Sequence, residues 1–115
     1  MQNICRSVGW ILAFAILALS VVPPSQRPMT GASHNMEHLA IYLATGLAFA
    51  MGYRDRLPAV AGGLLLFCGL IEVVQLWVPG RHARLSDFLV DAAAAGLGVA
   101  VAAAVTRIWP WRPVP

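Results

Sequence analysis

The chain has 115 residues, of which 59% are hydrophobic and 11% are charged, and its mean hydropathy is +0.72. Soluble domains are about a quarter charged, and a soluble chain this short cannot hide so much apolar surface in one core. The formal net charge is +3, and the sequence has arginines but no lysine. The arginines flank apolar runs without forming one basic face, which argues against nucleic-acid binding.

Four apolar runs approach the length of about 20 residues that a transmembrane helix needs. The first run, 7–22, is stopped by Pro23 and lacks a convincing small-x-small cleavage site, so we expect a retained membrane anchor and not a signal peptide. The second run, 37–53, begins in a polar stretch and becomes apolar within its first turns.

The third and fourth runs carry helix-start signals. In the third run, 58–78, Pro58 suits the first helical turn. In the fourth run, 86–108, Ser86 is expected to be the N-cap, and Asp87 is favourable beside the positive end of the helix dipole.

These runs predict an all-α membrane protein, one domain over 1–115 with four transmembrane helices in an antiparallel bundle. Four spans place both termini on one side of the membrane, and arginines favour the cytoplasmic side. Five arginines lie on the side of the termini and three on the other: Arg6, Arg54, Arg56, Arg107 and Arg112 against Arg27, Arg81 and Arg84. We therefore expect a multi-pass protein with both termini in the cytoplasm.

The ionisable side chains within the spans fall in one shallow layer near the outer surface. At a rise of 1.5 Å per residue, Glu72 lies roughly 9 Å and Asp91 roughly 7 Å below that surface. Spacings of three or four residues place side chains on one helix face, and three such pairs occur: His38 with Tyr42, Glu72 with Gln75, and Asp87 with Asp91. Because such groups are costly against lipid, we expect one polar cluster between the second, third and fourth helices, with Arg81 and Arg84 over its mouth.

Small residues dominate the fourth helix after Asp91. Ala92, Gly96 and Ala100 form a small-xxx-small row, and Gly98 leaves a further gap. Small residues let helix backbones approach closely. We expect this helix to pack inside the bundle, and a homo-oligomer through its small-residue face is the alternative.

The segments HLAIYLATGL and IEVVQLWVPGRHARLSDFLVDAAAAGLG together resemble the VanZ-like family of small bacterial membrane proteins. The resemblance covers about 33–105, and the positions that match the family pattern are His38, Tyr42, Glu72, Gln75, Arg81, Arg84, Ser86 and Asp87. The chain departs from that pattern at Asp91, where the family usually has Asn, at His34 and Asn35, which replace Asp-Lys, and in the spacing of its glycines. The resemblance implies a bacterial inner-membrane location, a role in the cell envelope and, through the founding member, a link to teicoplanin tolerance.

A polar pocket at the outer face of the membrane suits a lipid head group, a lipid-linked cell-wall precursor or a lipoglycopeptide. Arginines bind phosphate or carboxylate through forked hydrogen bonds, and carboxylates can hold amines or sugar hydroxyls. The expected ligand-binding residues are His38, Tyr42, Glu72, Gln75, Arg81, Arg84, Asp87 and Asp91. Membrane lipids are the expected partners, and no cofactor is implied.

Catalysis and transport are the alternatives to binding. Glu72, Asp87 and His38 could supply acid-base chemistry for an intramembrane hydrolase or transferase acting on an envelope lipid, but the pattern offers no evident Ser or Cys nucleophile, which favours binding. A transporter needs polar groups that continue to the inner side, where the sequence offers only Thr45 and Cys68.

A metal site is a further alternative. His34, Glu37 and His38 spell the His-x-x-Glu-His string of some zinc peptidases, and Asp87 or Asp91 could add a third ligand. The match is short and straddles the expected membrane boundary, so the sequence predicts no resident metal.

Overall fold

The structure of the protein is a computed structural model that describes residues 2–21, 34–78 and 85–109. These residues form four long helices and one short 3-10 helix: α1 (Gln2–Val21), α2 (His34–Gly52), η2 (Arg54–Arg56), α3 (Leu57–Gln75) and α4 (Leu85–Ile108). The described ranges contain no strand, so the predicted all-α class is confirmed.

The helix ends differ from the predicted ones for local reasons. Pro58 lies in the first turn of α3, as predicted. The α-helical part of α3 ends at Gln75 because the backbone N–H groups of Leu76, Trp77 and Val78 donate to carbonyls three residues earlier, which tightens the last turn.

The predicted N-cap of the last helix is wrong. α4 begins at Leu85, so Ser86 lies inside the first turn and is exposed. A difference of one residue at a helix end is common, but it removes the capping role expected for Ser86. Asp87 remains in the first turn, where a carboxylate favours the positive end of the helix dipole.

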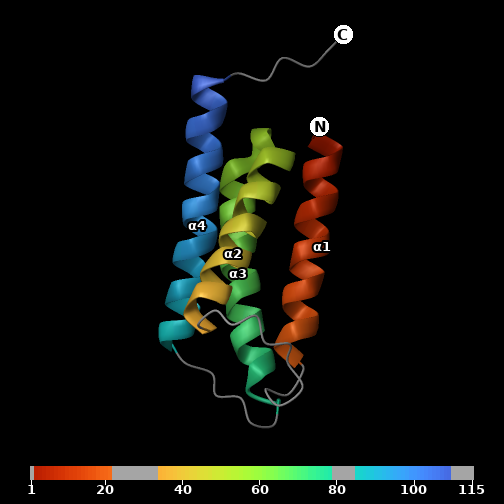
Figure 1. Cartoon of the computed structure of the whole chain (residues 1–115), viewed down its shortest axis with the longest axis vertical. Coiled ribbons are helices and arrows are strands. Elements are labelled where there is room, and N and C mark those ends of the chain that lie inside the picture. Colours follow the sequence, from red (N-terminus) through yellow and green to blue (C-terminus); the bar gives the residue numbers. More distant parts are fainter. Residues whose placement is uncertain (1, 22–33, 79–84, 110–115) are drawn as a thin grey trace.

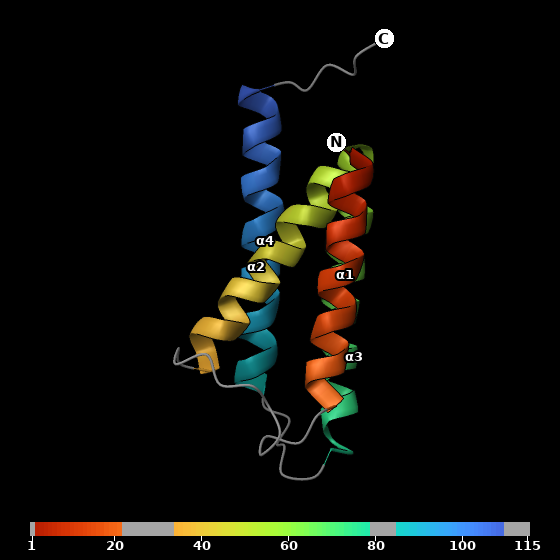
Figure 2. The same cartoon turned by 45° about the vertical axis from the view of Figure 1, so that its right-hand side comes forward.

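Figure 1 shows the four long helices along one axis, with the start of α1, the η2 segment and the end of α4 at the same end of the molecule. We call this the η2 end, and the opposite end, where α2 and α4 begin and α3 finishes, the His38 end. Figure 2 shows α2 slanting from the foot of α4 toward the α1–α3 pair. α2 therefore packs mainly against α4 and α1.

Within the described residues, three helical segments are long and apolar enough to cross a membrane: Gln2–Val21, Arg54–Gln75 and Leu85–Ile108. α2 is not among them, because its first turns carry Glu37, His38 and other polar residues that shorten its apolar part. The structure thus supports a membrane-embedded protein with three candidate spans, and it does not confirm the predicted fourth span.

Two glycines set the close approach of α2 and α4. A Cβ atom added at Gly46 would collide with the carbonyl oxygen of Ala95, and one added at Gly98 would collide with the carbonyl oxygen of Leu43. Backbone therefore lies directly against backbone where the two helices cross, as in other membrane helix pairs that meet through small residues.

The small residues that α4 buries are not the predicted row. They are Ala94, Ala95, Gly98 and Ala102. Asp91 is fully buried and fixes the inner face of the helix, and side chains three, four and seven positions later share that face. Gly96 and Ala100 of the predicted row are exposed, and a Cβ atom at Gly96 would meet nothing within 4 Å.

Candidate functional site

A histidine of α2 and an aspartate of α4 meet at the His38 end. The Nδ1 atom of His38 lies 2.8 Å from Oδ1 of Asp91. The Asp91 side chain is 0% exposed and that of His38 is 12% exposed. A buried carboxylate needs a partner of this kind, and an ionised Asp91 only accepts hydrogen bonds, so in that state Nδ1 of His38 carries the proton and donates it.

Tyr42 lies one helical turn after His38 and extends the same face of α2. The two rings stack with their centroids 5.9 Å apart and their planes inclined by 26°. Tyr42 is buried and belongs to the same packed core cluster as Cys68 and Ile71 of α3 and Ala94 of α4. Tyr42 therefore lies where α2 meets α3 and α4, the helices that were expected to share the polar cluster.

α3 directs its two polar side chains inward, as their spacing predicted. Glu72 and Gln75 are both buried in the last turns of α3, and Cys68 lies one turn before Glu72 with 0% exposure. Cys68 packs in one core cluster with Tyr42 and Ala94, so this part of α3 faces both α2 and α4. The part these residues play in ligand binding stays a prediction.

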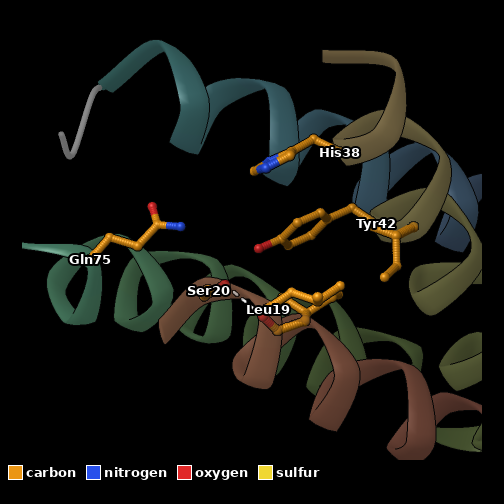
Figure 3. Close-up of a pocket in the computed structure, with 7 residues that line it drawn as sticks. Leu19, Ser20, His38, Tyr42 and Gln75 are labelled. Atoms are coloured by element: carbon orange, nitrogen blue, oxygen red, sulfur yellow. Dashed lines mark hydrogen bonds between the residues drawn. The ribbon is translucent and has the colours of Figure 1, made fainter. Parts of the chain in front are cut away.

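A cavity of about 20 Å³ lies beside the His38 ring. Its walls come from α1, α2 and α3: Ile16, Leu19, Ser20, His38, Ile41, Tyr42 and Gln75. Figure 3 shows the imidazole of His38, the hydroxyl of Tyr42 and the amide of Gln75 converging on one space. A volume of this size holds about one water molecule, so a single hydroxyl, amine or water fits there.

α1 contributes to this site, which the sequence did not predict. Ser20 in the last turn of α1 is buried, and its hydroxyl donates to the carbonyl oxygen of Ile16 at 2.6 Å. Ser20 lies at the end of the first apolar run and lines the same cavity as His38 (Figure 3). The similar depth of Ser20 and His38 was the one signal that the sequence offered. Serine is too common in apolar helices for that signal alone to identify a site residue.

Some predicted site residues are not joined to the cluster. Asp87 is partly exposed one turn before Asp91, and none of the described side-chain contacts connects it to the His38–Asp91 pair. Arg81 and Arg84 lie outside the described residues. Within the described part of the chain, no three His, Cys, Asp or Glu side chains gather in a way that could hold a metal ion.

No family model, curated protein or solved structure matches this chain. Functional inference therefore rests on the geometry of the described cluster.

Proposed function

We propose that this chain is a VanZ-like protein of the bacterial inner membrane, with four membrane-crossing helices in an antiparallel bundle. Its polar cluster would bind the head group of an envelope lipid, a lipid-linked precursor or a lipoglycopeptide at the periplasmic face. The observation that carries this proposal is the buried pair of His38 and Asp91, 2.8 Å apart, in a membrane-type helix bundle. Ionisable groups inside such a bundle are costly and therefore usually mark a functional site.

The geometry favours recognition of a small polar group at the base of the site. His38, Tyr42 and Gln75 face a space that accepts about one water-sized group. One hydroxyl or amine of a head group could enter this space, while the rest of the head group stays at the surface near Asp87 and the predicted arginines. Membrane lipids supply such groups at the depth where the cluster lies.

Catalysis is the second candidate function, and one contact favours it. A carboxylate that accepts a hydrogen bond from Nδ1 of an imidazole fixes the tautomer and the orientation of the ring. This arrangement is typical of a histidine that acts as a general base. His38 has this partner in Asp91 and lines the cavity. The serine that lines the same cavity, Ser20, donates its hydroxyl to a backbone carbonyl and not to His38, so binding remains the better-supported function.

Native mass spectrometry of the full chain, purified in mild detergent, tests both candidates. We expect the wild-type protein to retain one envelope lipid with an intact head group, and His38→Gln and Asp91→Asn to lose it. Arg107→Gln is the control, because Arg107 is an exposed charged residue in the last turn of α4, at the opposite end, and is not among the residues that line the cavity beside His38. Chemically altered lipid that accumulates with time would favour catalysis, and equal lipid retention in all variants would refute the site.

A further inference from the structure

An apolar groove runs along the η2 end of the molecule, away from the His38 cluster. Its volume is about 370 Å³, and its lining comes from α1, α2 and α3, including Trp10, Phe49, Gly63, Leu64 and Phe67. An apolar cavity of about 150 Å³ is enough to hold benzene. This groove therefore has room for a length of hydrocarbon chain.

A polar cavity of about 290 Å³ adjoins the groove. Its walls are formed by Gln2, Arg6, Tyr53, Arg54, Asp55 and Arg56. Two of these residues, Tyr53 and Arg56, also line the apolar groove, so the two spaces lie side by side. Three arginines face one aspartate in this cavity, and the local charge is positive.

Contacts between α1 and the end of α2 fix the wall that the two spaces share. The guanidinium of Arg6 lies 4.5 Å from the centre of the Tyr53 ring, and its Nε donates to the carbonyl oxygen of Gly52 at 2.8 Å. The indole Nε1 of Trp10 donates to the Tyr53 hydroxyl at 3.1 Å. Arg56 is exposed at the mouth, where its guanidinium can reach a ligand.

We propose that these two adjoining spaces bind one anionic phospholipid, with its phosphate among the arginines of η2 and an acyl chain in the groove. Guanidinium groups bind phosphate through paired, charge-assisted hydrogen bonds. Basic pockets between membrane helices at the cytoplasmic surface are suited to anionic head groups. Three arginines and one aspartate give the polar cavity a net positive charge, which favours an acidic head group over an uncharged one. The site lies at the opposite end from the His38 cluster and does not depend on the function proposed there.

Charge is tested with phosphatidylglycerol titrated into the full chain in detergent, with phosphatidylcholine as the neutral comparison. We expect phosphatidylglycerol to bind more tightly, and Arg56→Gln to weaken it about fivefold, the effect of one arginine near an anionic lipid surface. Arg107→Gln is the control, because Arg107 is an exposed arginine in the last turn of α4 that lines neither cavity. Equal binding of the two lipids, or equal loss in both variants, would overturn the proposal.

The acyl chain is tested with two adjacent glycines of α3. Gly62 and Gly63 are both exposed, and a Cβ atom at either meets nothing within 4 Å, but only Gly63 lines the groove. Gly63→Leu should therefore lower phosphatidylglycerol binding, and Gly62→Leu should leave it unchanged. If both variants bind as the wild type does and inorganic phosphate competes with the lipid, the arginines hold only an anion, and the lipid proposal fails.

Discussion

The burial of Asp91 is energetically costly, because its carboxyl group is shielded from both water and lipid. The buried carboxyl group is stabilised by His38, whose Nδ1 atom lies 2.8 Å from Oδ1 of Asp91. Removing one member of a buried charged pair leaves the other unmatched, which costs about 3–5 kcal/mol, whereas replacing both with apolar residues is often close to neutral.

We therefore expect His38→Leu and Asp91→Leu each to lower the unfolding temperature in detergent strongly, and the double variant to recover much of the loss. A thermal melt of the four proteins forms a complete double-mutant cycle. Additive losses would show that the two residues do not act as a pair.

Glu72 gives a second prediction at this scale. It is buried in α3, one helical turn after the fully buried Cys68. Glu72→Gln keeps the side-chain size but removes the acid, so we expect normal membrane insertion with reduced lipid retention and lower teicoplanin tolerance. Arg107→Gln provides the control for loss of a charged side chain away from both proposed lipid sites. An unchanged tolerance in Glu72→Gln would count against a role for this residue in the site.

At the scale of single helices, the crossing of α2 and α4 depends on glycine at particular positions. A methyl group at Gly98 would meet backbone atoms of α2, whereas one at Gly96, two residues earlier, would meet open space. Overpacking of this kind costs about 1–3 kcal/mol, while Gly to Ala in an open helix position gains up to about 1 kcal/mol.

Gly98→Ala should therefore lower the thermal unfolding midpoint, and Gly96→Ala should maintain or raise it. The two variants make the same chemical change on one helix, which removes helix propensity from the comparison. A Gly96→Ala protein that melts as early as Gly98→Ala would indicate that the exposed row is also packed, as in the oligomer considered from the sequence.

The helices could be predicted from the sequence because the apolar runs are long. The face of α4 that lies inside the bundle could not be predicted in the same way. Nearly every residue after Asp91 in this helix is Ala, Gly, Val or Leu, so no hydrophobic periodicity marks one side. Asp91 itself was the better guide, since its burial determines which alanines face inward. The contact between Asp91 and His38 depends on the slant of α2 across α4. The spacing of residues along the sequence gives no information about that slant.

Across the described helices, several polar side chains lie inside the bundle while many large apolar side chains lie on its outer surface. Asp91 and Thr45 are almost completely buried, while Phe14 is 73% and Leu66 is 66% exposed. In water this distribution would leave extensive apolar patches on the surface. In a bilayer it matches the solvent on both counts, because lipid covers the apolar side chains and the bundle shields the polar ones.

The position of α2 in the membrane decides the topology of the chain. Met36 is exposed in the first turn of α2, and Asp55 is exposed just beyond its end. If α2 crosses the bilayer, cysteines placed at these two positions react with an impermeant maleimide from opposite sides. The background carries Cys5→Ser, and the fully buried Cys68 can stay.

We expect Asp55→Cys and Arg107→Cys to label from the cytoplasmic side in inverted vesicles, since η2 and the end of α4 lie at the same end of the molecule (Figure 1). Met36→Cys and Trp77→Cys should label from the other side, because α2 begins and α3 finishes at the His38 end. Labelling of Met36→Cys and Asp55→Cys from one side would mean that α2 enters the membrane without crossing it. The His38 cluster would then lie at a different depth, and the proposed periplasmic head-group site would be wrong.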